Sequence, residues 1–188
     1  MENIWFTSDT HFYHRNILKF CPKTREGADS EEMTELMIQR WNEKVKPHDR
    51  IYHLGDFSFA NHQRTLQLLL RLNGQIHLIQ GNHDHVIDNN DIRSQFADIK
   101  AYKEIKVGTE KICMFHFPMY EWNRMHHGAW QLHGHTHGDV QIEGKSLDVG
   151  IDGPVTKGMS PVHFDEVAEW MSKREIRTHH GKHGENIL

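Results

Sequence analysis

Three short apolar runs stand out in the first half of the chain. They cover residues 3–8, 50–54 and 75–80, and each is bounded by polar residues. Runs of this length with polar or turn-forming neighbours are typical of buried β-strands. We therefore expect three strands whose side chains are buried on both faces of a sheet.

Two longer segments between these strands carry apolar residues at helical spacing. The first follows Asp29, which is suited to cap a helix, and the pattern ends near Pro47. The second follows Asn61 and closes at Asn73-Gly74. The alternation of strand and helix predicts a largely parallel sheet, with the carboxyl ends of the strands at one edge.

The second half of the chain changes character, because its apolar runs are shorter and are separated by turns rather than helices. Residues 99–107 and 110–116 predict a hairpin around Gly108-Thr109. Two further short strands are expected at 139–142 and 146–150. A last helix follows Pro161.

The length of 188 residues, with 37% hydrophobic and 26% charged residues, is that of one soluble globular domain. We expect that domain to span residues 1–171, followed by a polar, flexible C-terminal tail at 172–188. The net charge of -4 gives no overall positive field, so a nucleic-acid substrate would need a local basic patch.

Cysteine content and hydropathy predict a cellular compartment. Cys21 and Cys113 are too few for a disulfide framework or a cysteine zinc site, which favours a reducing environment. We expect Cys113 in the core and Cys21 as an idle thiol. The first residues lack the pattern of a secretion signal, and no run reaches the length of a membrane span. We therefore expect a cytoplasmic protein without membrane contact, whereas its oligomeric state is not predicted.

Polar clusters stand where the predicted strands end, which is where α/β proteins bind ligands. Their carboxylate, amide and imidazole groups suit a transition metal rather than Ca²⁺. We favour Mn²⁺, with Fe, Zn, Ni or Co also possible. In extended chain, Asp9 and His11 would share one face, as would His135 and His137. Seven candidate ligands are too many for one ion and fit two ions that share a carboxylate: Asp9, His11, Asp56, Asn82, His116, His135 and His137.

The order of the clusters resembles the calcineurin-like metallophosphoesterase superfamily, in particular its small, uncapped bacterial and phage members. The resemblance implies an α/β fold of two packed mixed β-sheets flanked by helices, in four α/β/β/α layers. It extends over most of the chain through five elements: Asp9-Thr10-His11, Gly55-Asp56, Gly81-Asn82-His83-Asp84, His116 and Gly134-His135-Thr136-His137.

The same resemblance implies a role for each residue. Asp9, His11 and His137 would hold one ion. Asn82, His116 and His135 would hold the other. Asp56 would bridge the two, and hydroxide between the ions would attack phosphorus. His83 would protonate the leaving oxygen, and Asp84 would orient His83.

One departure from the family pattern bears on the substrate. Many members continue after Gly-Asp with a further Asp and often an Arg, whereas this chain continues Phe57-Ser58-Phe59. Protein phosphatase activity is therefore disfavoured. The phosphate-binding cation has no clear candidate beyond His14 and Arg15, which follow the first cluster.

Three functions remain open at this point. A phosphodiesterase acting on a nucleotide or nucleic acid is favoured over a nucleotide or small-molecule phosphomonoesterase, and a non-catalytic metal-binding scaffold is the third. Neighbouring residues fit either a substrate site or a structural role. The basic ones could form a solvated face or contact phosphates, and the aromatic ones could stack a base or fill the core: Arg15, Lys19, Lys23, Arg25, Tyr120, Trp122 and Trp130.

Overall fold

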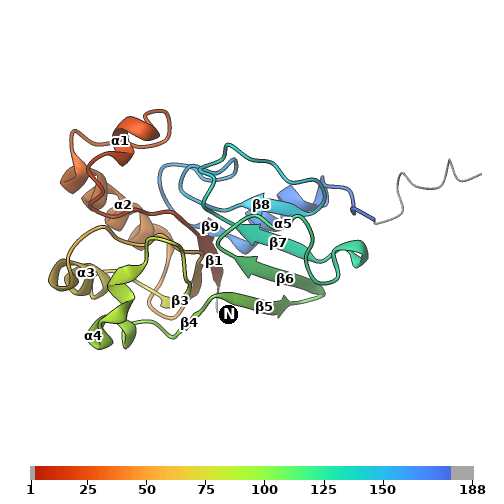
Figure 1. Ribbon diagram of the computed structural model, residues 1–188, viewed down its shortest axis with the longest axis horizontal. Coiled ribbons are helices and arrows are strands. Elements are labelled where there is room, and N and C mark those ends of the chain that lie inside the picture. Colours follow the sequence, from red (N-terminus) through yellow and green to blue (C-terminus); the bar gives the residue numbers. More distant parts are fainter. Residues whose placement is uncertain (1–2, 179–188) are drawn as a thin grey trace, which may run out of the picture.

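In the computed structural model, which describes residues 3–178, the chain forms two β-sheets with helices at their sides (Figure 1). The first sheet has five strands in the order β4-β3-β2-β1-β9, and the second has four in the order β5-β6-β7-β8. The strands are β1 (Ile4–Thr7), β2 (Arg50–His53), β3 (Gln75–Ile79), β4 (Asp98–Lys100), β5 (Tyr102–Val107), β6 (Glu110–Phe115), β7 (Trp130–His133), β8 (Ser146–Asp148) and β9 (Val162–His163).

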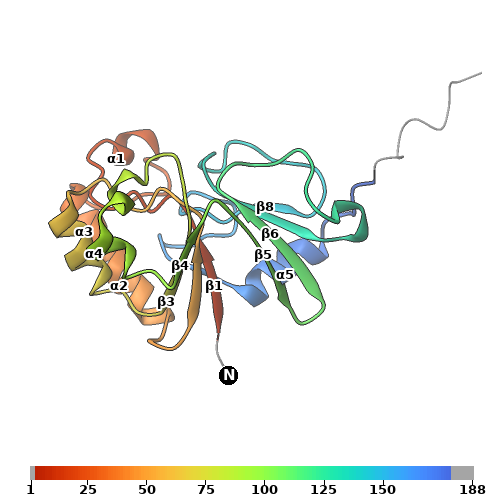
Figure 2. The ribbon, with the colours of Figure 1, turned by 60° about the horizontal axis from the view of Figure 1, so that its bottom comes forward.

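Most of the helices gather on the outer side of the first sheet, while α5 lies with the second sheet at the opposite side of the molecule (Figure 2). The α-helices are α1 (Ile17–Phe20), α2 (Ser30–Lys44), α3 (His62–Leu69), α4 (Asn90–Arg93) and α5 (Phe164–Ser172). Two short 3₁₀ helices are η1 (His85–Asp88) and η2 (Met125–His127).

Both sheets are mixed, as expected. In the first, β1 to β4 run parallel and β9 joins β1 antiparallel. In the second, β5 and β6 form an antiparallel hairpin, while β6, β7 and β8 run parallel. The parallel arrangement brings the carboxyl ends of β1, β2 and β3 to one edge, and those of β6 and β7 to one edge of the other sheet.

Besides a small hydrophobic cluster around Trp122, two larger ones hold these layers together. One packs α2 and α3 against the first sheet around Trp41, whose indole N–H also donates to the Asn73 carbonyl over 2.8 Å. The other joins the two sheets and α5, with Phe6, Ile112 and Met171 fully buried in it. Burial of a side chain of this size contributes roughly 1.5–3 kcal/mol.

The two predicted helix starts are found where the sequence places them. The Asp29 carboxylate accepts the N–H groups of Glu31 and Glu32 over 2.9 Å at the start of α2. The Asn61 side chain accepts the N–H of Arg64 over 3.0 Å at the start of α3. Each cap satisfies donors that the first helical turn leaves unpaired.

The predicted strand at 99–107 is wrong as a single element. Its first residues belong to β4, which pairs with β3 in the first sheet, and the remainder forms β5, which pairs with β6 in the second. The chain therefore passes from one sheet to the other near residue 101. Apolar alternation continues through that point, so periodicity alone cannot locate the break.

Two other expectations for the second half also need correction. Residues 139–142 form a loop instead of a strand, because Gly138 and Gly144 adopt φ of 81° and 87°, which turns the chain at both ends. The last helix begins at Phe164, because Val162 and His163 first pair with β1 as β9. The sequence reasoning also missed η1 and α4.

The described part of the expected tail contacts the rest of the protein. Arg174 donates to the carbonyls of Ile142 and Gly144 over 2.8 and 3.0 Å, and Arg177 donates to the Tyr120 carbonyl over 2.8 Å. Residues 179–188 lie outside the described residues. Within residues 3–178, no helix combines the length and hydropathy needed to cross a membrane.

Candidate metal and phosphoester site

The polar clusters meet where the carboxyl ends of strands from both sheets approach each other. The Asp9 N–H donates to the Gly55 carbonyl over 2.9 Å, which joins the loops after β1 and β2. The His135 N–H donates to the Asp9 carboxylate over 2.9 Å, which joins the loop after β7 to the first sheet. Similarly, the Gly134 N–H donates to the His116 carbonyl over 3.0 Å. One site therefore collects residues from positions 9 to 137.

Five of the seven candidate ligands adopt left-handed backbone conformations, which are rare outside glycine. Their φ angles lie between 47° and 68°, at Asp9, His11, Asp56, His135 and His137. Each costs on the order of 1 kcal/mol or more, and such residues concentrate at functional sites. The expectation that Asp9-x-His11 and His135-x-His137 are extended is therefore wrong. Left-handed turns, rather than strand alternation, direct these side chains.

The first candidate metal group consists of Asp9, His11 and His137. One ligand atom from each lies within 4.8 Å of the others. In the described part of the chain, Asp9 Oδ1 and His11 Nε2 are buried without a hydrogen-bond partner. Burial alone would raise the pKa of Asp9, but the neighbouring imidazoles of His11, His116 and His137 lower it to about 2. A buried carboxylate beside an unpartnered imidazole nitrogen fits a divalent cation.

The second group consists of Asp56, His116 and His135, again with ligand atoms within 4.8 Å of one another. His116 Nδ1 donates to the Leu54 carbonyl over 2.7 Å, which leaves the lone pair of Nε2 directed inward. That nitrogen lies 3.0 Å from the Asn82 Oδ1 atom. Since both atoms offer lone pairs in this tautomer, they fit a shared cation.

Asp56 stands between the two groups. Its Oδ2 atom lies 3.7 Å from His11 Nε2 and 3.6 Å from His116 Nε2, so a single oxygen faces both. Its Oδ1 atom accepts the N–H of His83 over 2.9 Å, which fixes the carboxylate plane. This placement is the one that a carboxylate shared by two cations requires.

His83 is exposed at the rim of the site, with its ring 6.2 Å from that of His11. The expected contact between Asp84 and His83 is not found among the described residues. Instead, the buried Asp84 carboxylate accepts the backbone N–H groups of Asp56, Phe57 and Gly81 over 2.7–2.9 Å. Asp84 therefore fixes the loop that carries Asp56, because three amide donors hold its oxygens in place.

A buried ion pair between Arg25 and Asp152 holds the His137 ring in place. His137 Nδ1 lies 2.7 Å from Asp152 Oδ2, which leaves Nε2 as the nitrogen available to a metal. Arg25 forms two bonds of 2.9 and 2.7 Å to the same carboxylate and also donates to the backbone carbonyls of Asp9 and Thr10. Burial alone would raise the pKa of Asp152, but His137 and Arg25 hold it well below its usual range.

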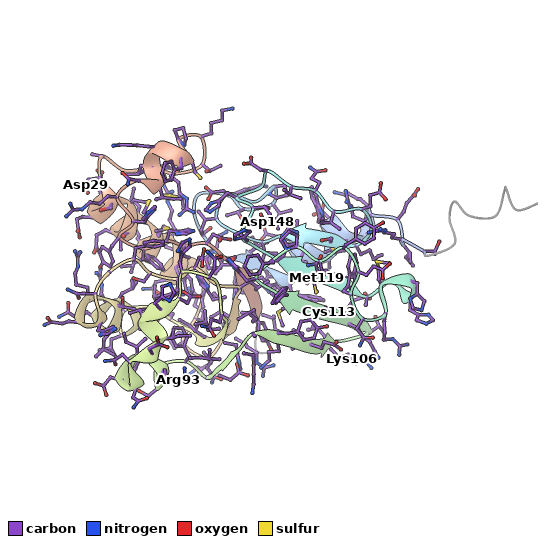
Figure 3. The ribbon with its side chains drawn as sticks, in the orientation of Figure 1. Asp29, Arg93, Lys106, Cys113, Met119 and Asp148 are labelled. Atoms are coloured by element: carbon purple, nitrogen blue, oxygen red, sulfur yellow. The ribbon has the colours of Figure 1, made fainter. Side chains whose placement is uncertain are left out.

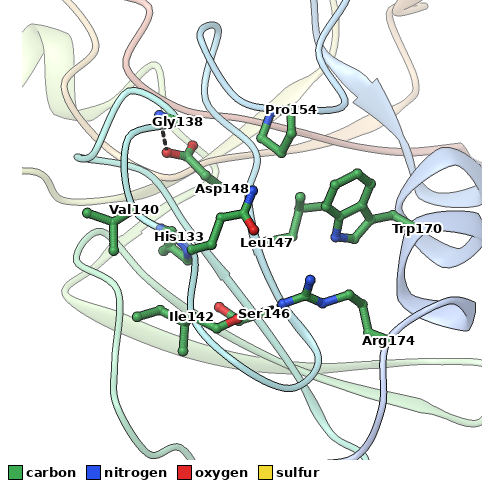
Figure 4. A pocket seen from close by; sticks show the side chains of 11 residues that line it. His133, Gly138, Val140, Ile142, Ser146, Leu147, Asp148, Pro154, Trp170 and Arg174 are labelled. Atoms are coloured by element: carbon green, nitrogen blue, oxygen red, sulfur yellow. Dashed lines mark hydrogen bonds between the residues drawn. The ribbon is translucent and has the colours of Figure 1, made fainter.

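Asp148, at the end of β8, fixes the loop that carries both histidines. It accepts the Thr136 hydroxyl over 2.8 Å and the Gly138 N–H over 3.0 Å, the second of which Figure 4 marks. The cavity drawn there has a volume of only about 20 Å³, room for little more than a water molecule. Asp148 lies toward the middle of the view in Figure 3 and is buried, which agrees with a supporting role.

The remaining candidate residues differ in their placement. The His14 ring lies 5.6 Å from that of His11, next to the metal groups. Arg15 is exposed and lines a different cavity together with Asp29 and Glu31. The basic segment is not one solvated face, because Arg25 is buried.

Of the three aromatic residues, Trp122 and Trp130 are buried and fill the core, whereas Tyr120 is 71% exposed and stacks with Arg177. None of the three is among the ring contacts of the metal groups within residues 3–178. Cys113 is buried as expected. Cys21 is half-buried with its Sγ 3.7 Å from His137 Nδ1, so it touches a candidate ligand.

Sequence reasoning missed the supporting residues. The completely buried His53 ring lies 2.9 Å from the Thr10 hydroxyl, and it accepts the Gly55 N–H over 3.2 Å. Burial lowers the pKa of His53 to about 3, so the ring is neutral at pH 7. His53 has a weak sequence signal, as a histidine inside an apolar strand. Asp152 and Arg25 are 127 residues apart and have none.

Known proteins of similar sequence cover nearly the whole chain. An uncharacterised protein of Methanocaldococcus jannaschii, MJ1445, is 29% identical over 94% of this chain and 95% of its own length. The gene 66 protein of mycobacteriophage L5 is 27% identical over 81% of this chain and 87% of its own. The crystal structure of AQ665, a protein of unknown function from Aquifex aeolicus, has the same fold, with a TM-score of 0.69 at 24% identity over 90% of this chain and all of AQ665.

The sequence also matches the profile of the calcineurin-like phosphoesterase superfamily domain over residues 3–149. That match extends from β1 to the end of β8 and thus includes every candidate metal ligand. The two mixed sheets and their helices agree with it, as do the carboxylate and imidazole groups at the strand ends. The chain belongs to the calcineurin-like phosphoesterase superfamily, whose members are metal-dependent phosphoesterases.

Proposed function

We propose that this protein is a phosphodiesterase that uses two divalent metal ions, with Mn²⁺ favoured, and acts on a nucleotide or a nucleic-acid end. The observation that carries the two-ion assignment is the position of Asp56. Its Oδ2 atom lies 3.7 and 3.6 Å from imidazole nitrogens of the two ligand groups. One carboxylate oxygen thus faces both groups, as a shared ligand must.

The residues at hand fit the metals by their chemistry. Asp9, His11 and His137 would hold one ion, and Asn82, His116 and His135 the other. Asp56 would serve both. When bound, such ions neutralise charge on phosphoryl oxygens and lower the pKa of water.

The protein's own residues position the reacting groups. The left-handed turns and the Asp84 loop hold the ligand atoms in place before substrate arrives, which avoids reorganisation during the reaction. His83, exposed at the rim, would give its proton to the leaving oxygen. A positioned general acid contributes roughly 10²–10⁴-fold.

The preference for diesters rests on the residues around the site. Where many relatives carry a further Asp and Arg after Gly-Asp, this chain places Phe57, Ser58 and the half-exposed Phe59. Phe57 is fully buried, so the segment presents the ring of Phe59 and no cation for a doubly charged monoester. The singly charged phosphate of a diester needs less compensation.

Metal restoration tests this proposal. Protein stripped of metal would be supplied singly with Mn²⁺, Ni²⁺, Co²⁺, Zn²⁺ or Mg²⁺ and assayed on bis-p-nitrophenyl phosphate and p-nitrophenyl phosphate. We expect Mn²⁺ to restore cleavage and the diester to be the better substrate. A large preference for the monoester would instead support a phosphomonoesterase. No turnover with both ions bound would indicate a metal-binding scaffold.

A further inference from the structure

We infer that the protein has a separate subsite for the leaving group of its substrate, and that this subsite accepts a flat ring such as a nucleobase. The subsite is the cavity between Phe59, the start of α3 and η1. This inference rests on the proposed function in one respect, because it takes His83 as the acid that protonates the leaving oxygen. Beyond the proposed function, it identifies the part of the substrate attached to that oxygen.

The cavity adjoins the metal groups without being part of them. It has a volume of about 390 Å³, within the range of small-molecule sites. His83 is among its lining residues, so the cavity begins where the leaving oxygen would receive its proton. The other lining residues are Ser58, Phe59, Ala60, Asn61, His62, His85 and Val86.

Phe59 is the feature that selects a flat ring. Its side chain is 40% exposed, which is unusual for phenylalanine beside a polar site. The ring is fixed by three histidine rings, with centroids 4.2 Å away at His14 and 5.1 Å away at both His11 and His83. An aromatic ring that neighbouring rings hold in place and that remains 40% exposed offers a stacking surface for a planar group.

The direction of departure follows from the same geometry. On the proposed mechanism, the phosphorus lies at the metal groups and the leaving oxygen faces His83. Whatever is attached to that oxygen therefore extends past His83 into the cavity. Its walls alternate apolar groups, Phe59 and Val86, with polar ones such as Asn61 and His85, which suits a nucleoside better than an alkyl chain.

A matched substrate set tests the inference. A thymidine dinucleotide is compared with two analogues in which one sugar or the other carries no base. The nucleoside released without phosphate identifies the leaving group. We expect loss of the leaving base to lower kcat/KM about tenfold, in the range of base–aromatic stacking, and loss of the retained base to have less effect.

Substitutions then assign the preference to Phe59. Phe59→Leu should abolish the difference between base-bearing and abasic leaving groups, while Phe59→Trp retains it. Phe20→Leu is the matched control, because Phe20 is 70% exposed and near His14 but does not line the cavity. Equal cleavage of all substrates by the unaltered protein would overturn the inference. A preference that follows the retained base, or that survives Phe59→Leu, would do the same.

A binding measurement separates this inference from the proposed function. In Phe59→Trp, added thymidine or adenosine should quench tryptophan fluorescence relative to the unaltered protein, even without metal, whereas Phe20→Trp should show no change. Quenching without any metal-restored hydrolysis would leave the subsite standing and the proposed function refuted. Hydrolysis without quenching and without a base preference would refute the subsite alone.

Discussion

The two halves of the molecule hold four of the candidate ligands, two carboxylates and two imidazoles, by opposite chemistry. In the half built on the first sheet, carboxylates are held by N–H donors, as with Asp9 by the amide of His135 and Asp56 by that of His83. In the half built on the second sheet, imidazoles are held by oxygen acceptors, as with His116 by a backbone carbonyl and His137 by Asp152.

This difference has a physical reason. An N–H donor fixes a carboxylate without cancelling the charge that attracts a cation. An oxygen acceptor fixes the proton on one nitrogen of an imidazole and leaves the other nitrogen free for the metal. Substitution of a carboxylate in the first half should therefore remove charge from the site. Substitution of an acceptor in the second half should instead alter the orientation of an imidazole ring.

The largest effect is expected for Asp56→Asn. Because one oxygen faces both groups and would serve both ions, its replacement should lower turnover by more than about 100-fold, beyond the loss seen when only the support of a ligand is removed. Elemental analysis of the purified variant should show fewer than the full number of ions. Asp91→Asn, at an exposed position on α4, is the control. Near-normal turnover in Asp56→Asn would contradict a shared carboxylate.

His83→Ala should separate catalysis from metal binding. We expect turnover to fall by about 10²–10⁴-fold while metal content stays unchanged, because His83 lies in neither ligand group. His127→Ala, which removes another exposed histidine, should behave as the unaltered protein. Loss of metal from His83→Ala would show that it is a ligand and that its assigned role is wrong.

A smaller effect tests how the second half orients its rings. Asp152→Asn should lower the affinity for one of the two ions by about 10–100-fold, because His137 loses its charged acceptor. Co²⁺ titration measures this affinity. Asp148→Asn is the matched control, since Asp148 fixes the same loop through Thr136 and Gly138 and not through the ring of a candidate ligand. Equal losses in both variants would mean that loop position, and not ring orientation, governs affinity.

Asp152→Asn also leaves the buried Arg25 without its ionised partner. Loss of one partner from a buried pair destabilises a fold by roughly 3–5 kcal/mol. The metal titration is therefore accompanied by a denaturant curve of the metal-free variant at the same temperature. If Asp152→Asn is unfolded, the double variant Arg25→Met/Asp152→Met replaces it. This variant should fold and still bind one ion with lowered affinity.

The smallest effect concerns His53, which is buried at the end of β2 in the first half. Its pKa in the folded protein is about 3, below the ordinary value of 6.5, so the unfolded chain binds the extra proton first as pH falls. The stability of the metal-free protein should therefore decrease as pH falls from 6.5 towards 3. At pH 5 this contribution is about 2 kcal/mol. In His53→Gln, the free energies of unfolding from denaturant curves at pH 7 and pH 5 should differ by correspondingly less than in the unaltered protein.

The sequence predicted the site better than it predicted the support of the site. Five of the seven candidate ligand positions follow strands that apolar runs predict, whereas His135 and His137 follow β7, which was not predicted. The structure brings all seven together. The Arg25–Asp152 pair joins distant segments without any local pattern, so only the folded chain shows it. The left-handed turns also escaped prediction, since the residues there are Asp and His instead of the glycine that usually marks such turns.

The fold was predictable to a similar degree. The parallel strands of the first sheet and the capped helices follow from periodicity and capping residues, both of which are local, whereas the two mixed sheets follow from the family resemblance. The passage from one sheet to the other near residue 101 is not local, because it depends on which partner each half of the segment finds. Asp98 pairs beside His77, whereas Ile105 pairs beside Ile112, and nothing within the segment itself distinguishes these partners.

The interlocked loops at the site have a consequence for the whole fold. Ligands from positions 9–82 and 116–137 would attach the same pair of ions, so bound metal would cross-link the two sheets. Any ligand that binds only the folded chain adds to its stability by mass action, about 2.7 kcal/mol at a concentration 100 times its Kd. The thermal stability of this protein would then rise with the concentration of metal ions around it.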